Sequence, residues 1–530
     1  MRNAALIRIV YMCRLVLNKE QSCGSPFCTD LDYERRRVLH FGLVCVSSQQ
    51  KGKYMPEPEN ARTAVDQVAT VGASLEEAAI NEFRADLRGE LLRPGESDFD
   101  AARRVFNGAI NKLPALIVRC AGVADVISSV RFANVHELLV AVRGGGHNVA
   151  GNAICDGGIV IDLSRMRSIR IDPERRTARA EAGATWGDFD HETQAHGLAT
   201  PGGMVSSTGI AGLTLGGGIG WLLGTRGLTC DNLLSADVVT ADGRFLTASP
   251  TSHEDLFWGL RGGGGNFGIV TSFEYRLHPL DPVLGGSIIY PLDQAQQVLA
   301  FYSSFTSSAP DELTVNATLY THPDGLPVVS IDLCYAGPIE KGEEVVRPLR
   351  ELGSPLVDLI QPMLYCKLQK MFDNPFRVGL QTYWKATFSS DLSEDAISTV
   401  IAHFSDVPSA QTIVFIHHYH GEMCRIGKED TAFTHRDAKY NVLIAPYWRQ
   451  QGETERNMQW TQDFFSAMQP YSMDTVYVNF LSNEGEKRVK AAYGPAKYAR
   501  LVALKNKYDP TNFFRLNQNI KPDCPNEGDE

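Results

Sequence analysis

The chain has 530 residues, a length that exceeds one simple hydrophobic core and predicts two or three lobes. Its formal net charge is −11, from 62 acidic and 51 basic residues, and no block of lysine and arginine interrupts that balance, which argues against a nucleic-acid-binding protein. A hydrophobic content of 43% with 21% charged residues is ordinary for a soluble globular protein.

The eleven cysteines form no CxxC pair, and no stretch reaches the length of a membrane span. Scattered thiols of this kind are typical of a reducing cytoplasm. The apolar beginning of the chain is interrupted by Arg2, Arg8 and Arg14, which is unlike a signal peptide. We therefore expect a cytoplasmic protein, a monomer or a homo-oligomer, with no nucleic-acid and no membrane partner.

Residues 1–54 show no sustained periodicity of apolar residues, and in this they differ from the rest of the chain. They predict a poorly ordered extension, or a start codon assigned too early, and the alternative is an amphipathic leader. A regular pattern begins with a helix over 74–89, for which Ser74 is a plausible cap.

The next segments alternate strands and helices. A strand over 115–120, a helix over 122–137 and a strand over 138–144 predict a parallel unit, followed by a strand over 158–164. Further along, the pattern predicts a hairpin over 168–184, a helix over 185–197 and a hairpin over 236–249 with Asp-Gly at its turn.

The composition changes near residue 283, where the glycine clusters stop. Alternating strands are expected over 286–292, 314–322 and 328–336, and helices over 339–353 and 392–405. This shift predicts a second domain over 283–475. The last segment, 476–524, returns to aromatic and basic residues.

Three glycine clusters stand out. Gly263, Gly265 and Gly268 satisfy GxGxxG, but a helix precedes them and a strand follows, which is the reverse of a Rossmann NAD site. "STGIAGLTLGGGIGW" (207–221) is no Walker loop; it predicts a tightly packed apolar loop, or else a flexible turn. With "VRGGGHNVAG" (142–151), these loops indicate a large, extended, partly anionic cofactor.

The same motifs carry a family resemblance. "VRGGGHNVAG", "DGGIVIDLSRM", "GGMVSSTGIAGLTLGGGIGWL", "LFWGLRGGGGNFGIVTSFEYRL" and the closing "YARLVALKNKYDPTNFFRLNQNIKP" resemble the FAD-linked oxidases of the vanillyl-alcohol oxidase superfamily, which have a PCMH-type FAD-binding domain. They are most similar to the berberine bridge enzyme-like family, with its bacterial 6-hydroxynicotine-type and carbohydrate oxidases. The resemblance runs from about residue 80 to about 523.

The resemblance implies an α+β fold. An FAD-binding domain of two α+β subdomains would take residues 55–282 and the closing segment 476–524. A substrate-binding domain with an antiparallel sheet and helices would take residues 283–475 and cover the flavin.

The resemblance also implies the cofactor site. His147 would bond covalently to the 8α-methyl group of the flavin, the alternative being a histidine packed without a bond. Other contacts would come from Arg143, Gly144, Gly145, Gly146, Asn148, Gly151, Thr208, Gly209, Gly212, Ile269, Val270, Asn517 and Gln518. Relatives often carry a second link through a cysteine at the position of Val205, so a single link is expected here.

The catalytic base departs from the family pattern: relatives often have "YxNY" where this chain has "YVNF" (477–480), and Phe480 cannot take a proton. Tyr477 is the first candidate, unless it only packs on a strand. Tyr383 and Lys385 form the next candidate, since alternate strand positions share one face and a lysine favours the phenolate.

Four other residues have open interpretations. His418 and His420 share a strand face that could bind a metal, but no third ligand is evident, and solvated or hydrogen-bonded histidines are the alternative. His435 and Arg436 could contact an anionic substrate or be structural. No metal is expected.

These features predict an FAD-dependent oxidase that removes two electrons from an alcohol, amine or sugar-like small molecule and reduces O2 to H2O2. The alternatives are a flavin dehydrogenase with another electron acceptor and a weakly catalytic flavin-binding protein. Substrate identity is not encoded in a motif, because loops of the second domain determine specificity.

Overall fold

The computed structural model describes residues 75–375 and 378–523. The predicted extension over 1–54 lies outside these residues, as does Ser74. The chain divides into two units, 1–57 and 58–530, and all described residues belong to the second. Within the described part, no helix is both long enough and apolar enough to span a membrane.

The first sheet has four strands in the order β1 (Glu90–Leu92), β2 (Leu116–Arg119), β4 (Ile159–Asp162) and β3 (Val140–Arg143). β2 and β3 both pair with β4 in parallel, and α5 (Val123–Val135) connects β2 to β3, so the predicted parallel unit is confirmed. The glycine loop at 144–146 begins where β3 ends.

The helix before this sheet is shorter than expected. α3 (Glu77–Asp86) has Glu76 at its N-cap, without a side-chain cap. It packs on α5 through Phe83 and Phe132, whose rings stack 4.1 Å apart. The short helix α4 (Phe99–Ala102) follows β1.

The second sheet has five antiparallel strands in the order β5 (Ile169–Asp172), β6 (Thr177–Glu181), β10 (Ile269–Arg276), β8 (Leu233–Val239) and β9 (Phe245–Ala248). Both predicted hairpins are present in it. α6 (Trp186–Gln194) begins with a capping box between Thr185 and Asp188. The glycine-rich stretch after it, expected to be a loop, contains the short helix α7 (Ile210–Leu215). α8 (Leu223–Arg226) and α9 (Glu254–Leu260) complete this part.

The third sheet is the largest and is antiparallel. Its order is β15 (Val357–Asp358), β12 (Val283–Pro291), β14 (Pro327–Tyr335), β13 (Leu313–Thr321), β19 (Ile413–His418), β20 (Tyr440–Ala445) and β18 (Lys385–Ser389), and β16 (Gln361–Met363) pairs with β12. All its strands lie within the predicted second domain.

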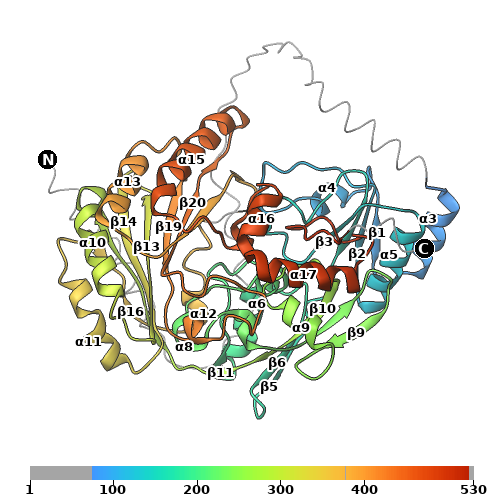
Figure 1. Ribbon diagram of the computed structural model, residues 1–530, viewed down its shortest axis with the longest axis horizontal. Helices are drawn as coiled ribbons and strands as arrows, with labels where there is room; N and C mark the ends of the chain where they lie inside the picture. Colours follow the sequence, from blue (N-terminus) through green and yellow to red (C-terminus); the bar gives the residue numbers. More distant parts are fainter. Residues whose placement is uncertain (1–74, 376–377, 524–530) are drawn as a thin grey trace, which may run out of the picture. The chain divides into compact units, whose positions relative to one another are not determined.

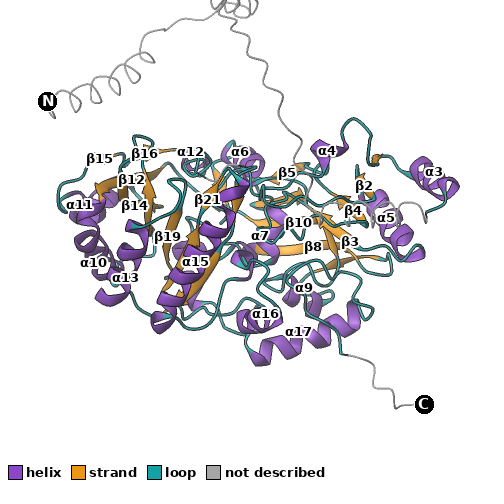
Figure 2. Ribbon diagram, turned by 90° about the horizontal axis from the view of Figure 1, so that it is seen from above, coloured by secondary structure: helices purple, strands orange, loops and turns teal. Residues whose placement is uncertain are grey.

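Helices cover one face of this sheet. They are α10 (Ala295–Thr306), α11 (Ile339–Arg350), α13 (Glu394–Ser405) and α15 (Thr454–Met468) (Figures 1 and 2). Along each strand, successive side chains point to opposite faces of the sheet, so alternate residues share a face. On β19, Val414 and Ile416 join the apolar core beneath the helices, whereas Phe415 and His417 point the other way.

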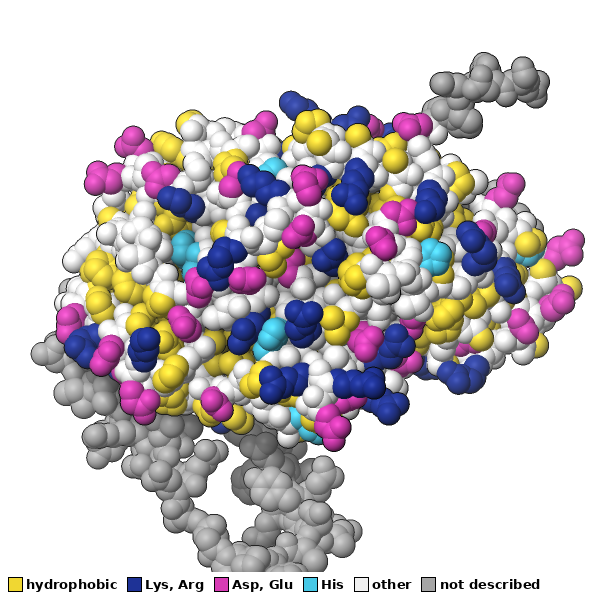
Figure 3. Space-filling model, turned by 60° about the horizontal axis from the view of Figure 1, so that its bottom comes forward, with side chains coloured by type: hydrophobic (Ala, Val, Ile, Leu, Met, Phe, Trp, Pro, Cys, Tyr) yellow, Lys and Arg dark blue, Asp and Glu magenta, His cyan; other side chains and the backbone are white. Residues whose placement is uncertain are grey.

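The closing segment returns to the first half of the chain. α16 (Glu486–Tyr493) leads into α17 (Pro495–Tyr508), which packs against α9 (Figure 1). Farther on, the Asn266 side chain donates to the Gln518 carbonyl at 3.2 Å. On the face drawn in Figure 3, basic and acidic side chains are interspersed.

Candidate active site

A cavity of about 250 Å³ lies between the glycine loops and the face of the large sheet that the helices leave uncovered. Three segments and the sheet line it: the glycine loop at 144–148, the turn at 203–212, the segment at 477–480, and side chains from the large sheet and its neighbouring loops. Its lining includes Phe106, Met204, Val205, Leu213, Ile219, Phe372, Trp384, Phe415, His417, Leu443, Tyr477, Asn479 and Phe480.

Two of the lining loops touch backbone to backbone. A Cβ on Gly145 would lie 2.4 Å from the Gly209 nitrogen, and a Cβ on Gly209 would lie 2.4 Å from the Gly145 nitrogen. Only glycine permits this approach. A Cβ on Gly212 would meet no atom within 4 Å. The glycines thus form a wall of backbone, with open space beside it, that fits an extended, flat ligand such as a flavin dinucleotide.

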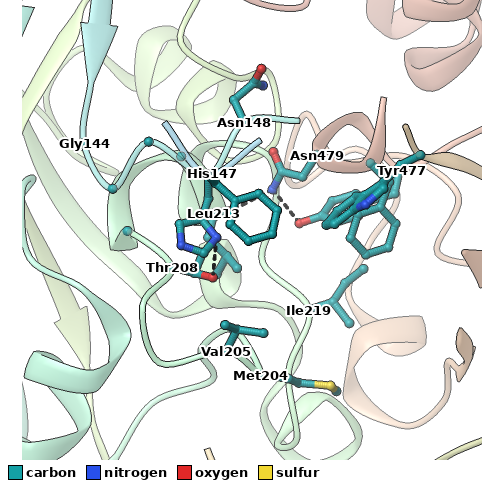
Figure 4. A pocket seen from close by; sticks show the side chains of 18 of the residues that line it. Gly144, His147, Asn148, Met204, Val205, Thr208, Leu213, Ile219, Tyr477 and Asn479 are labelled. Carbon is teal, nitrogen blue, oxygen red and sulfur yellow. Dashed lines mark hydrogen bonds between the residues drawn. The ribbon is translucent and has the colours of Figure 1, made fainter. Parts of the chain in front are cut away.

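His147 points from the glycine loop into this cavity (Figure 4). Its Nε2 lies 3.1 Å from the Ser207 hydroxyl and its Nδ1 lies 3.4 Å from the Thr208 hydroxyl. The ring keeps part of its surface open to the cavity, but surrounding protein lowers the pKa of His147 to about 4. The imidazole is therefore neutral at physiological pH, the form in which a ring nitrogen is nucleophilic.

Tyr477 faces the cavity from the opposite side (Figure 4). Its hydroxyl oxygen accepts from the Gly218 N–H at 2.8 Å and from Asn479 Nδ2 at 2.7 Å. Burial raises the pKa of the Tyr477 phenol above its usual value. The hydroxyl oxygen already accepts two hydrogen bonds, and the raised pKa keeps the hydroxyl protonated. The Tyr477 hydroxyl can therefore still donate one hydrogen bond, but it has no free lone pair with which to accept another.

Several predicted cofactor residues line the cavity and others do not. Gly144, Gly145, Gly146, His147, Asn148, Thr208, Gly209 and Gly212 line it. Arg143, Gly151, Ile269, Val270, Asn517 and Gln518 do not, so their contacts with a cofactor stay predictions. Among these, Ile269 and Val270 are buried in β10, while Gln518 Nε2 donates to the Leu481 carbonyl at 2.9 Å, next to the 477–480 segment.

The structure does not bring Tyr383 and Lys385 to the cavity. They share a face as predicted, with Lys385 Nζ 5.7 Å from the centre of the Tyr383 ring. That face, however, is the one that α15 covers: Lys385 Nζ lies 5.1 Å from the centre of the Phe465 ring and pairs with Glu484 at 2.6 Å. The intervening residue, Trp384, lines the cavity instead.

The other candidate residues lie outside the lining. Arg436 is buried and pairs with Asp231 at 2.7 Å, which is a structural role. His435 lies close to the Ala491 carbonyl, with Nε2 at 3.3 Å from the oxygen. The rings of His418 and His420 stack 4.7 Å apart, and no group of three or more potential metal ligands occurs in the described part of the chain.

Residues of the cavity that no motif indicated are mostly aromatic. Phe106, Phe372, Trp384 and Phe415 belong to segments far apart in the sequence. The alternating pattern of β19 could have placed Phe415 and His417 on a common face, but not on the face that meets the glycine loops.

Comparison with known proteins identifies the class. Residues 114–249 match a family model described as FAD binding domain, and residues 476–521 match one described as berberine and berberine like. An FAD-linked oxidoreductase of Dictyostelium discoideum is 32% identical over 448 residues, which cover 84% of this chain and 97% of that protein. (R)-6-hydroxynicotine oxidase of Paenarthrobacter nicotinovorans is 31% identical, over 82% of this chain and 97% of the oxidase.

A solved structure shows the same fold. The crystal structure of 6-hydroxy-D-nicotine oxidase from Arthrobacter nicotinovorans superimposes with a TM-score of 0.77 at 30% identity, over 82% of this chain and 98% of the other. The protein is thus an FAD-linked oxidoreductase, with FAD as its cofactor. It belongs to the berberine bridge enzyme-like family, as its sequence motifs predicted.

Proposed function

We propose that the protein is an oxidase that carries its FAD on a single covalent bond to His147. The observation that carries this proposal is the position of His147: a neutral imidazole on a glycine loop, aimed into a cavity whose wall is backbone. Bound FAD supplies the acceptor for two electrons from the substrate and passes them on. The residues of the chain bind the ring, orient the substrate and exclude water.

The proposal of a single bond is supported by the described residues of the cavity lining, which offer no second anchor. Val205 occupies the position where a cysteine would lie, and no cysteine is among the described residues that line the cavity. Cys230 is fully buried away from the lining, and burial raises the pKa of its thiol well above the usual value. A thiol in that state is unreactive.

The reaction is the two-electron oxidation of an alcohol, amine or sugar-like molecule, with O2 as the final acceptor and H2O2 as the product. The name of the Paenarthrobacter relative, a 6-hydroxynicotine oxidase, supports both a small-molecule substrate and oxygen as acceptor.

Reoxidation of the flavin separates an oxidase from a dehydrogenase. The purified protein is reduced with dithionite without oxygen, excess reductant is removed, and air is admitted while flavin absorbance and peroxide are recorded. We expect rapid return of the oxidised spectrum with peroxide formation. Slow return, accelerated by an artificial dye, would instead identify a dehydrogenase.

A further inference from the structure

The turn at 205–208 carries the two hydroxyl groups that contact the His147 ring. Ser207 Oγ lies 3.1 Å from Nε2 and Thr208 Oγ1 lies 3.4 Å from Nδ1, so each ring nitrogen faces one hydroxyl. A hydrogen bond of 3.1 Å from the Thr208 N–H to the Val205 carbonyl closes the turn. The position of the turn therefore sets the direction of the ring that we propose as the flavin anchor.

A carboxylate holds this turn from another part of the chain. Asp373 Oδ1 accepts from the Ser206 N–H at 2.8 Å, and Asp373 Oδ2 accepts from the Ser206 hydroxyl at 2.6 Å. Hydrogen bonds to an ionised carboxylate are shorter and stronger than those between neutral groups. Asp373 lies within the predicted substrate-binding domain and the turn within the predicted FAD-binding domain, so this contact ties the turn to the opposite domain.

Packing fixes the position of Asp373. It follows the short helix α12 (Tyr365–Leu368), which packs against α6 (Figures 1 and 2). From the same segment, Gln369 Nε2 donates to the Gly203 carbonyl at 3.0 Å. Two side chains of one short segment thus hold the backbone just before the turn and within it.

Formation of the flavin bond places a positive charge on the His147 ring. A ring nitrogen that uses its lone pair for the new bond leaves the imidazole as a cation until the other nitrogen loses its proton. Burial disfavours this charge and lowers the pKa of His147 to about 4, whereas a backbone hydrogen bond of Ser207 and the charge of Asp373 both act to raise that pKa. A carboxylate near a developing cation stabilises it.

We propose that Asp373 is a positioning residue for attachment of the flavin, holding the turn that directs His147 and stabilising the cation that forms on its ring. This inference rests on the proposed covalent bond to His147. Asp373 is not among the described residues that line the cavity, so it acts through Ser206 and through its charge rather than by touching the flavin. Because Asp373 and the turn belong to different predicted domains, attachment requires both to be folded together.

The attachment reaction balances with O2 as the oxidant. One C–H bond of the flavin 8α-methyl group breaks, its proton is released, and its electron pair passes into the flavin ring, which is reduced by two electrons. One ring nitrogen of His147 bonds to the methyl carbon, and the other nitrogen loses its proton. O2 then takes up the two electrons and the two released protons as H2O2. Ser207 is exposed, so the proton of the imidazole has a path to water.

Removal of the charge tests the role of Asp373. Asp373→Asn keeps the size of the side chain but not its charge. The full-length chain is produced with little riboflavin and mixed with FAD in air; absorbance gives the total flavin, and in-gel fluorescence over time gives the fraction that is covalently attached. We expect Asp373→Asn to bind as much flavin as the parent protein but to attach it roughly tenfold more slowly, because the cation loses its stabilising charge.

Three further variants separate charge from structure. Asp373→Glu retains the charge and should recover part of the rate. Ser206→Ala removes one of the two hydrogen bonds to Asp373 and should slow attachment, but less than Asp373→Asn does. Asp190→Asn is the matched control, because this buried carboxyl accepts from Gln369 at 3.0 Å in the same α6–α12 contact, and it should attach flavin at the parent rate.

Attachment at the parent rate in Asp373→Asn would overturn this role. Equal slowing in Asp190→Asn, or a loss of total flavin in Asp373→Asn that Asp373→Glu does not restore, would also overturn it, because either result is that of a merely structural residue. If Asp373→Asn does not fold, parent-rate attachment in Ser206→Ala refutes the role instead. Flavin that stays free in the parent protein would contradict the proposed bond to His147 itself, which is a different result from any of these.

Discussion

The imidazole of His147 lies nearly flat against the phenyl ring of Phe106, with centroids 4.5 Å apart and planes inclined by 19°. Phe106 also holds the glycine loop, because its backbone N–H donates to the Gly146 carbonyl at 3.0 Å. One residue thus fixes both the loop and the side chain that we propose as the flavin anchor.

Phe106→Ala should lower the free energy of unfolding by about 3–5 kcal/mol, as for other buried phenylalanines, and should also lower the fraction of protein with covalent flavin. Urea unfolding and in-gel flavin fluorescence measure the two effects. Phe83→Ala is the control, since Phe83 is buried in a stack with Phe132 away from the cavity. Equal flavin loss in both variants would show that Phe106 has no specific part in positioning His147.

Tyr477→Phe tests whether this tyrosine donates or accepts protons. The variant leaves the buried Gly218 N–H without its acceptor, at a cost of about 1–3 kcal/mol, whereas Asn479 Nδ2 keeps its hydrogen bond to the Leu213 carbonyl at 3.1 Å. Flavin reduction should slow while the shape of its pH profile stays the same. Tyr493→Phe, which removes a buried hydroxyl that has no partner among the described residues, should be nearly neutral. Loss of an ionisation from the profile of Tyr477→Phe would assign the base to Tyr477.

Asp190 makes stability depend on pH. Its Oδ2 accepts from Gln369 Nε2 at 3.0 Å, and burial raises the pKa of Asp190 to about 7. The folded state therefore holds this proton more tightly than the unfolded state. The stabilisation is fully present below the unfolded pKa of 3.8 and is lost as pH rises through about 7.

Asp190→Asn mimics the protonated carboxyl at every pH. Its stability relative to the parent protein should increase by about 3 kcal/mol between pH 5 and pH 8, from the size of the shift. Thermal unfolding at the two pH values measures this change, with Asp293→Asn, at an exposed position, as the control. A relative stability that falls with rising pH would be the wrong sign and would contradict the assignment.

Arg436 is expected to matter for folding rather than for substrate. Its guanidinium donates to Asp231, the Met423 carbonyl and the Thr431 hydroxyl, all in a buried site. Arg436→Met should cost about 3–5 kcal/mol, because it leaves Asp231 buried without its partner. Adding Asp231→Leu should recover part of this loss. A large rise in KM without a loss of stability would instead place Arg436 in the substrate site.

Most of the fold could be predicted from the sequence. The parallel unit of β2, α5 and β3, the two hairpins and the long strands of the large sheet follow from hydrophobic period and turn residues, which are local signals. The short helix α7 was missed, because six glycines in that stretch favour a loop when propensity alone is considered.

Only some of the residues that line the cavity could be predicted from the sequence. Its glycine loops and Tyr477 lie in motifs, so the sequence indicated them. Its aromatic wall depends on which face of each strand meets the glycine loops, and this is a property of tertiary packing. Alternation paired Tyr383 with Lys385 correctly, but only the position of α15 decides that Trp384 faces the cavity instead.

The state of the flavin tests the central claim most directly. The protein is denatured in acid, digested, and the peptide that contains His147 is analysed by mass spectrometry, beside the same preparation of His147→Ala. Our account predicts a yellow precipitate and a peptide heavier by one FAD, with the added mass on His147 and on no cysteine, and colourless precipitate from the variant. A yellow supernatant with an unmodified His147 peptide would contradict it.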